Sequence, residues 1–201
     1  MKRFFDIIFS LIFLILFSPL FIFIVLAIKL FDRGPVFYRA PRVGKGGTLF
    51  RMFKFRTMVV NADRIGGSST ADDDPRITRV GKWLRKSKLD EFPQLFNVLL
   101  GDMSIVGPRP LLKEYLKLYT PEQARRHEVK PGITGWAQVN GRNAITWEQK
   151  FKFDVRYVDN WNLWLDLKII IMTIILVLKA EGINQPGQAT MEKFQGDNRK
   201  S

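Results

Sequence analysis

An uncharged run of 22 residues, from Ile7 to Ile28, lies near the start of the chain and constrains its folding more than any other feature. As a helix this run would be about 33 Å long, close to the hydrocarbon thickness of a bilayer. A membrane helix is therefore the default expectation. A secretory signal peptide fits less well, because the run is long for such a segment and no small-residue cleavage site follows it.

The middle of this run contains Ser18 and Pro19, which predict a kink. Proline removes a backbone hydrogen bond from a helix, and a nearby serine hydroxyl can bond to a carbonyl that is left free. Both flanks of the run are positively charged, and such flanks prefer the cytoplasmic side of a membrane. A kinked helix that crosses the bilayer and a bent, re-entrant hairpin both fit this pattern, so the residues alone leave the two open.

The remainder of the chain is strongly basic and lacks several kinds of catalytic residue. Lys and Arg total 32 against 19 acidic residues, the net charge is +13, cysteine is absent and His127 is the single histidine. A basic surface attracts nucleic acid, anionic lipid or phosphorylated substrates. Thiolate chemistry and clustered histidines are excluded, so carboxylates, hydroxyls, Lys and Arg must carry any reaction. We expect His127 to be structural, or a hydrogen-bonding residue beside the glycine-rich loop that follows it.

Residue patterning after the apolar run predicts a mixed α+β fold. Short strands are expected over 36–58, around a glycine-rich turn at 44–47 and with one cationic face. Helices are expected over 76–88, 92–100, 111–127 and 146–160, and loops over 61–75 and 130–143. A second apolar run, Ile169–Leu178, is too short to span a bilayer. A helix at the membrane surface, beginning with Trp161 and Trp164, and an ordinary buried core helix are both left open for it.

Asp90 and Glu91 form the first motif that could carry chemistry. Pro93 favours the first turn of a helix, which places Asp90 near the helix N-terminus, where a carboxylate is stabilised. Adjacent residues on a helix diverge by about 100°, so the two carboxylates would have different roles. One could be a nucleophile or metal ligand and the other a base or an orienting group. Taken alone, the pair also fits an ordinary acidic helix cap.

Two further motifs place arginines on constrained loops. Pro108 and Pro110 fix the backbone on either side of Arg109, which suits bidentate phosphate binding. The segment 130–143 contains three glycines, which allow a ligand to approach the backbone closely, and Arg142 follows the last of them. Each motif taken alone also fits an ordinary surface loop.

In their order along the chain, these motifs resemble the bacterial sugar transferases, the monotopic phosphoglycosyl transferases. The likeness extends from Arg3 to about Phe194 and rests on Leu-Asp-Glu-Phe-Pro-Gln-Leu-Phe-Asn-Val, Gly-Asp-Met-Ser-Ile-Val-Gly-Pro-Arg-Pro and Lys-Pro-Gly-Ile-Thr-Gly-Trp-Ala-Gln-Val-Asn-Gly-Arg. The chain resembles the small members of the family, which carry no further membrane helices. Its general likeness is greatest to the enzymes that start N-linked glycan assembly from UDP-N,N′-diacetylbacillosamine.

The resemblance implies that the chain transfers a sugar 1-phosphate from a UDP-sugar to polyprenyl (undecaprenyl) phosphate, giving polyprenyl-diphosphate-sugar and UMP. It implies that Asp90 is the nucleophile, forms a covalent phosphosugar-aspartate and is a ligand of the required Mg²⁺. Glu91 is implied to place Asp90, the metal or the acceptor. The residues implied to bind phosphate or substrate are Arg85, Arg109, Arg142 and Asp166.

The resemblance also implies an architecture and a location. It favours a re-entrant membrane helix over 1–32, a mainly helical catalytic domain over 33–185 with interfacial amphipathic helices and a short β element, and a polar tail over 186–201. The expected location is the cytoplasmic face of the bacterial inner membrane, with membrane lipids but no nucleic acid as partners; a monomer and a homodimer are both left open. The rival interpretations are a membrane-tethered module that binds nucleic acid or anionic lipid, and a scaffolding protein. The binding-module interpretation predicts tolerance at Asp90.

Overall fold

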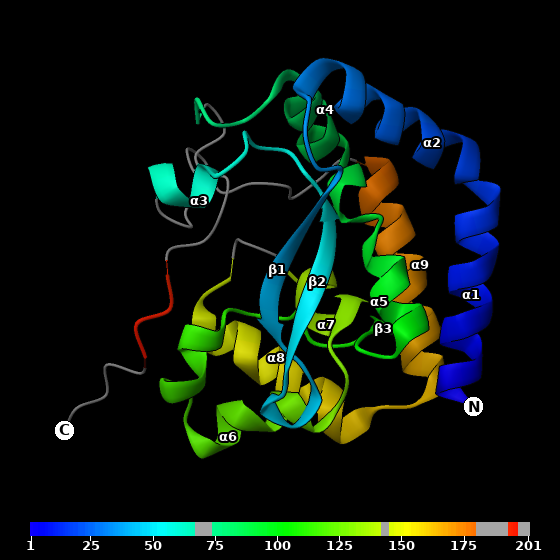
Figure 1. Ribbon diagram of the computed structural model, residues 1–201. Coiled ribbons are helices and arrows are strands. Elements are labelled where there is room, and N and C mark those ends of the chain that lie inside the picture. Colours follow the sequence, from blue (N-terminus) through cyan, green and yellow to red (C-terminus); the bar gives the residue numbers. More distant parts are fainter. Residues whose placement is uncertain (67–73, 142–144, 180–192, 197–201) are drawn as a thin grey trace.

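The computed structural model describes residues 1–66, 74–141, 145–179 and 193–196, which form helices packed around two small sheets (Figure 1). The helices are α1 (Lys2–Leu16), α2 (Ser18–Ala27), α3 (Ala62–Ile65), α4 (Arg79–Ser87), α5 (Gln94–Leu100), α6 (Pro121–Ala124), α7 (Trp136–Val139), α8 (Trp147–Asn160) and α9 (Leu163–Lys179). The strands are β1 (Phe37–Val43), β2 (Leu49–Phe55), β3 (Ser104–Val106) and β4 (Gly132–Thr134). Short π or 3-10 turns are η1 (Ile28–Asp32), η2 (Lys45–Gly47), η3 (Leu89–Glu91), η4 (Lys113–Lys117) and η5 (Arg125–Glu128). The expected mixture of helix and a short β element is confirmed.

The N-terminal apolar run is broken into two helices. Phe17 separates them with φ −96° and ψ 11°, and Pro19 lies in the first turn of α2. Pro19 has no N–H to continue the α1 hydrogen-bond pattern, and the Ser18 hydroxyl donates to the Ile15 carbonyl at 2.8 Å. The predicted kink is confirmed, with 63° between α1 and the stretch Ser18–Asp32. Among the described residues no unbroken helix is both long and apolar enough to cross a bilayer, whereas this bent pair has the necessary length and composition.

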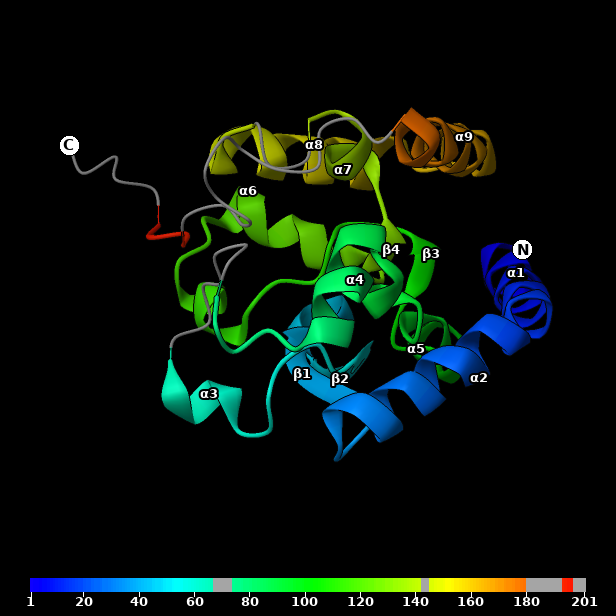
Figure 2. The same cartoon turned by 90° about the horizontal axis from the view of Figure 1, so that it is seen from above.

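Three helices, α1, α2 and α9, lie along one side of the molecule (Figures 1 and 2). We call this the apolar side, because large apolar side chains are exposed on all three helices: Phe4, Phe5, Phe9, Leu11, Ile12, Phe13, Ile15, Leu16, Ile22, Phe23, Leu26, Trp164, Leu167, Ile171, Ile174, Ile175, Val177 and Leu178. The opposite face of α9 is buried, at Asp166 and Ile169. The protein therefore covers only half of α9, so the core-helix interpretation of this segment is wrong for its exposed face.

Strands β1 and β2 form an antiparallel hairpin, as the sequence predicted for 36–58. Side chains alternate between the two faces of a strand. One face, which we call the inner face, packs through Ala40 and Met52 against Val98 of α5 and Met103. The register places six residues on this face, as the pairs Tyr38 with Lys54, Ala40 with Met52, and Arg42 with Phe50.

The second sheet joins two of the sequence motifs, because β3 and β4 pair in parallel. The two backbones approach closely at Gly107, which follows β3, and at Gly132, which begins β4. A Cβ on Gly132 would lie 2.1 Å from the Gly107 nitrogen, and one on Gly107 would lie 2.4 Å from the Lys130 carbonyl oxygen. Only glycine fits at this crossing. The loop predicted over 130–143 contains β4 and α7. The sequence does not indicate β4, because pairing with a distant strand leaves no local periodicity.

Two other expected boundaries differ from the structure. The helix expected over 111–127 is divided into η4, α6 and η5. Pro121 starts α6 afresh, and Thr120 and Gln123 cap it reciprocally, Gln123 N–H donating to the Thr120 hydroxyl at 3.2 Å. The part of the expected 61–75 loop that is described contains the single-turn helix α3.

Candidate active site

Asp90 and Glu91 lie in a tight turn between α4 and α5. Helix α4 ends at Lys88, which has a left-handed conformation with φ 59°, and η3 follows at once. Leu84 of α4 is fully buried, and Leu89 packs into the same apolar cluster. The helix α5 begins at Gln94, just after Pro93, so Asp90 precedes the helix rather than lying inside its first turn. The turn is thus anchored by apolar packing on its inner side.

Phenylalanines connect this turn to the break in the N-terminal helices. The ring of Phe92, the residue after Glu91, lies 5.8 Å from Phe17 at the break and 6.2 Å from Phe21 of α2. Phe21 also contacts Phe55 of β2 at 4.8 Å. The position of Asp90 and Glu91 is therefore coupled by direct packing to the bend between α1 and α2.

Glu91 is bound by two cations from different elements. Its carboxylate accepts a hydrogen bond from Lys54 Nζ of β2 at 2.7 Å. It also accepts hydrogen bonds from both terminal nitrogens of Arg109, with Nη1 lying 3.1 Å from Oε2. Burial alone would raise the pKa of Glu91, but the charges and hydrogen bonds of Arg109 and Lys54 outweigh it and hold the pKa well below its usual range. Glu91 is therefore an ionised anchor whose oxygens are already occupied.

Asp90 is buried but has little direct bonding. Its closest cation is Lys54, whose Nζ lies 3.7 Å from Oδ2, and among the described residues it accepts no hydrogen bond. Burial raises the pKa of Asp90; Lys54 opposes this shift and the charge of Glu91 adds to it. A poorly solvated carboxylate whose oxygens are not committed can act as a nucleophile or a metal ligand.

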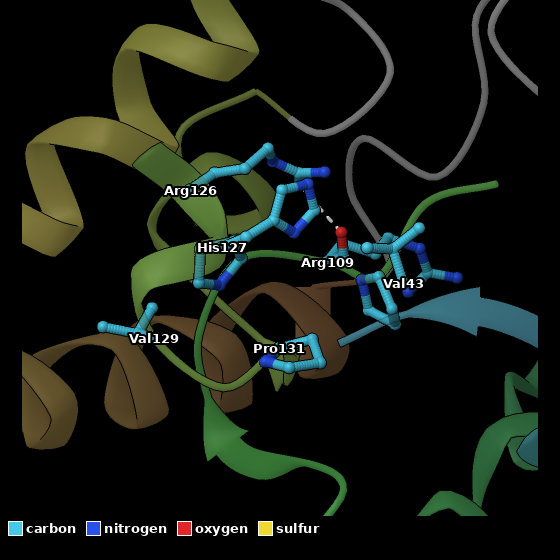
Figure 3. Close-up of a pocket in the computed structure, with 8 residues that line it drawn as sticks. Val43, Arg109, Arg126, His127, Val129 and Pro131 are labelled. Carbon is cyan, nitrogen blue, oxygen red and sulfur yellow. Dashed lines mark hydrogen bonds between the residues drawn. The ribbon is translucent and has the colours of Figure 1, made fainter. Parts of the chain in front are cut away.

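The loop that carries Arg109 is held from behind by a buried ion pair of Arg126 and Asp154. Arg126 Nη2 donates to the Arg109 carbonyl at 2.8 Å (Figure 3). The same nitrogen donates to Asp154 Oδ2 of α8 at 2.8 Å. Both Arg126 and Asp154 are almost completely buried. The Pro108–Pro110 segment therefore lies on a fixed support, and the Arg109 side chain, 40% exposed, extends from it toward Glu91.

His127 borders the small cavity behind this loop, with Val43 and Arg109 on the other side (Figure 3). Burial, and next the charge of Arg126, lower the pKa of His127 to about 4. The imidazole is therefore neutral near pH 7. Its ring lies 5.5 Å from that of Tyr119, which agrees with the structural role expected for it.

The other predicted site residues have different surroundings. Arg85 Nε donates to the Thr57 hydroxyl at 2.9 Å. Asp166 accepts hydrogen bonds from the Tyr157 hydroxyl at 2.6 Å and the Trp161 indole at 3.1 Å, and it also binds Lys2. The structure thus joins Asp90, Glu91 and Arg109 but does not bring Asp166 to them. Arg142 lies outside the described residues.

Sequence reasoning did not single out two residues of this site. Lys54 was expected only as part of a cationic strand face, and Arg42 only as a positive flank. The alternation of apolar and basic residues over 49–56 is the signal for Lys54. The hairpin register, which the sequence does not reveal, places Arg42 on the same face as Lys54.

The residues of the site fit a metal that is shared with a substrate. Among the described residues no three His, Cys, Asp or Glu side chains are grouped as a metal site. Mg²⁺ is commonly held by one or two carboxylates together with water and substrate phosphates. Asp90 has uncommitted oxygens for this purpose, whereas those of Glu91 are taken by Lys54 and Arg109.

Comparison with known proteins gives consistent results. Residues 1–180 match the family described as bacterial sugar transferase. The chain is 51% identical over 196 residues to the uncharacterized sugar transferase EpsL of Bacillus subtilis, covering 98% of this chain and 96% of EpsL. It is 43% identical over 197 residues to the undecaprenyl-phosphate galactose phosphotransferase of Salmonella typhimurium, covering 90% of this chain and 41% of that protein. It is also 43% identical over 183 residues to the UDP-glucose:undecaprenyl-phosphate glucose-1-phosphate transferase of Escherichia coli, covering 87% and 39%. The chain spans less than half of these last two relatives.

Proposed function

The chain belongs to the bacterial sugar transferase family, and we propose that it transfers a sugar 1-phosphate from a UDP-sugar to undecaprenyl phosphate, with release of UMP. Relatives that share 43% of their aligned residues with it are named for sugar phosphate transfer to this lipid. The observation that carries the proposal is the difference between the two adjacent carboxylates. Glu91 is fully bonded by cations, whereas Asp90 beside it is buried and uncommitted.

The proposed reaction has two displacements at one phosphorus. An Asp90 oxygen attacks the phosphorus that bears the sugar, the bond to the bridging oxygen breaks, and UMP leaves with that oxygen. An oxygen of undecaprenyl phosphate then attacks the same phosphorus, the aspartyl–phosphorus bond breaks, and the Asp90 carboxylate is regenerated. A covalent intermediate divides one difficult transfer into two easier steps.

The residues around Asp90 supply positive charge close to its carboxylate. Glu91 fixes Lys54 and Arg109 around Asp90, because it binds both cations at once. Those cations partly neutralise the charge that gathers when a carboxylate meets a phosphate. Mg²⁺, which we propose that Asp90 holds together with substrate phosphate, would supply further charge neutralisation on the phosphoryl oxygens.

For the membrane we propose a re-entrant anchor formed by α1, α2 and η1, with the site on the cytoplasmic face of the inner membrane. The 63° bend and the exposed apolar side support this arrangement. Both ends of the anchor are tied to the same body: Lys2 binds Asp166 of α9, and Asp32 accepts a hydrogen bond from Thr78 of α4 at 2.6 Å. Because both ends of the anchor contact the same part of the protein, both ends lie on the same side of the bilayer in this arrangement.

Intact-mass measurement tests the chemistry. The protein in detergent is incubated with a UDP-sugar and Mg²⁺ but no acceptor, and we expect an adduct of the mass of one phosphosugar, which disappears on addition of undecaprenyl phosphate. Asp90→Asn should abolish the adduct, while Asp159→Asn, which alters an exposed carboxylate paired with Arg125, should retain it. Full adduct formation by the Asp90 variant would contradict the proposal and leave a binding module or a scaffold as the better interpretation.

The donor sugar is tested with a panel of UDP-sugars. The relatives described above are named for galactose and glucose, and the sequence resembles enzymes that use UDP-N,N′-diacetylbacillosamine. Release of UMP from each donor in the presence of undecaprenyl phosphate identifies the substrate. Release of UDP instead would indicate transfer of the sugar alone and would overturn the proposed phosphosugar step.

The anchor's topology is tested by labelling, which the absence of cysteine makes simple. One cysteine is added ahead of Met1 and another replaces Lys45, which is exposed in the turn of the hairpin. A re-entrant anchor makes both sites reactive from the same side of sealed vesicles. Reactivity from opposite sides would establish a crossing helix.

A further inference from the structure

Arg42 is a half-buried arginine near the end of β1. Its guanidinium has one hydrogen bond to another residue, from Nη1 to the Pro41 carbonyl at 2.8 Å, and within the described part of the chain it forms no ion pair. The acid of the adjacent site that could pair with it, Glu91, is already bound by Lys54 and Arg109. A charged group that is partly removed from water without a counter-charge is unusual unless a ligand supplies one.

The fold places Arg42 beside Arg109. Arg42 lies on the inner face of the hairpin, the face that also carries Lys54. The next residue, Val43, donates its N–H to the Leu111 carbonyl at 3.2 Å, directly after the loop that holds Arg109. Figure 3 shows Val43 close to Arg109 on the wall of the small cavity. Two arginines from two separate elements are thus brought to the same edge of the site.

The electrostatics of this pair favour an anion. Burial lowers the pKa of Arg42, and the positive charge of Arg109 lowers it further, while Tyr38, Glu91 and Glu114 partly compensate. Counting the residues at the site, Lys54, Arg109 and Arg42 carry three positive charges, and Asp90 and Glu91 carry two negative ones. One positive charge is left over, and it corresponds to Arg42, for which the described residues provide no ion-pair partner.

We propose that Arg42 and Arg109 form a two-arginine clamp for the phosphate-ester anion that reacts at Asp90. The Arg42 guanidinium can bind phosphate oxygens in a bidentate manner, while Arg109, whose terminal nitrogens already bond to Glu91, contributes its positive charge and its remaining N–H groups. Groups from two different elements fix both the position and the orientation of the anion. This inference rests on the proposed function, since it assigns a ligand to the same site. The anion is either the diphosphate of the sugar donor or the phosphate of the lipid acceptor, which share this chemistry.

Steady-state kinetics of Arg42→Ala and Arg42→Lys test the clamp. We expect Arg42→Ala to raise KM for one phosphate substrate by about tenfold or more, the equivalent of one charge-assisted hydrogen bond. Arg42→Lys should recover only part of this, because a point charge replaces a planar fork. The control is Arg51→Ala, which removes an exposed arginine from the opposite face of the same hairpin and should leave KM nearly unchanged. Equal KM values for the Arg42→Ala and Arg51→Ala proteins would overturn the clamp.

The two sources of the anion are separated by the two half-reactions. A clamp on the donor slows formation of the phosphosugar adduct and weakens binding of UDP-sugar, whereas a clamp on the acceptor leaves the adduct intact and raises KM for undecaprenyl phosphate alone. Wild-type protein that forms no adduct would refute the proposed function. Active wild-type protein with an unaffected Arg42 variant would refute the clamp only.

A milder substitution, followed by a binding measurement, covers the case in which Arg42→Ala fails to fold. Inorganic pyrophosphate is titrated by calorimetry into the full-length protein and into Arg42→Gln, which keeps a polar side chain of moderate length. We expect weaker pyrophosphate binding to Arg42→Gln than to Arg51→Gln. Identical affinities of the two variants would count against the clamp without reference to turnover.

Discussion

At the scale of single residues, the site separates two neighbouring carboxylates by their partners. Glu91 is a structural anion, because Lys54 and Arg109 hold it ionised. Burial raises the pKa of Asp90, and the nearby cations, of which Lys54 at 3.7 Å has the largest effect, offset this shift only in part. The sequence could predict that the two adjacent carboxylates have different roles, but it could not predict which of them Lys54 and Arg109 bind. That choice depends on the register of β2 and on the contact with the Arg109 loop, both of which are long-range.

The first prediction concerns Lys54 and the pH dependence of adduct formation. As the proposed nucleophile, Asp90 must be ionised, so adduct formation should be lost as pH falls through its pKa. Lys54→Met removes the positive charge that most opposes the upward shift of the Asp90 pKa, so the acidic limb of the rate profile should move to higher pH. Lys82→Met, at an exposed position of α4, should leave the limb in place. Rates of adduct formation measured across pH 4–8 test this prediction. An acidic limb of Lys54→Met that is unchanged, or that moves to lower pH, contradicts it.

The second prediction concerns the buried pair of Arg126 and Asp154. Asp154→Asn leaves a fully buried guanidinium without its counter-charge, which typically costs about 3–5 kcal/mol. The same change loosens the support of the Arg109 carbonyl. Denaturant unfolding in detergent should therefore show a large loss of stability, and adduct formation should slow.

A nearby exposed pair provides the control for that experiment. Arg125, the residue before Arg126, forms an exposed ion pair with Asp159. Asp159→Asn should alter stability far less, because water screens and replaces an exposed ion pair. Restoration of stability in Arg126→Met/Asp154→Leu would show that the unpaired charge, and not lost packing volume, causes the damage. Equal effects of the Asp154 and Asp159 changes would refute this account.

At the scale of elements, the parts predicted correctly are those with local signals. Proline at position 19 marks the helix break, the glycine-rich turn at 44–47 marks the hairpin, and the helical periodicity over 146–160 matches α8. The elements that were missed are β3, β4 and the divided segment 111–127. Strands of three residues are too short to show alternation, and they exist only because distant backbones pair at Gly107 and Gly132. Local sequence patterns therefore predicted most helices and the hairpin. They did not predict the pairing of β3 with β4, which joins the Arg109 motif to the segment 130–143.

The third prediction concerns Arg56, which fastens the end of the anchor to the catalytic body. This buried side chain donates to the backbone carbonyls of Asp32 and Arg33 at 3.3 and 2.9 Å, and to those of Pro35 and Met58 at 2.6 and 3.2 Å. Arg56→Met leaves these carbonyls without a donor, which should lower the free energy of unfolding by on the order of 3 kcal/mol. Thermal unfolding in detergent micelles tests this against Arg51→Met, which alters an exposed arginine of the preceding strand β2. Similar unfolding temperatures for the two variants would contradict the assigned role.

At the scale of the whole molecule, the apolar side and the site are parts of one arrangement. The bend between α1 and α2 packs through Phe17 against Phe92, the residue after Glu91. In the proposed membrane arrangement, the depth of the anchor therefore fixes the depth of Asp90. An acceptor whose phosphate is attached to a long lipid chain can reach a site only near the headgroups, so a bent anchor and a rigid connection to the site suit the proposed reaction.

The last prediction places α9 in the same interface. Trp164 is 80% exposed on the apolar side, and indole rings favour the boundary between headgroups and acyl chains. Brominated lipids quench only tryptophans that touch the bilayer, so Trp164→Phe should remove most of the quenching seen in reconstituted wild-type protein. Trp147, which packs at 5.6 Å from Tyr115 and Phe151 in an aromatic cluster, provides the matched change. Trp147→Phe should leave the quenching intact, whereas full quenching after Trp164→Phe would remove α9 from the membrane and leave the bent anchor to set the height of the site alone.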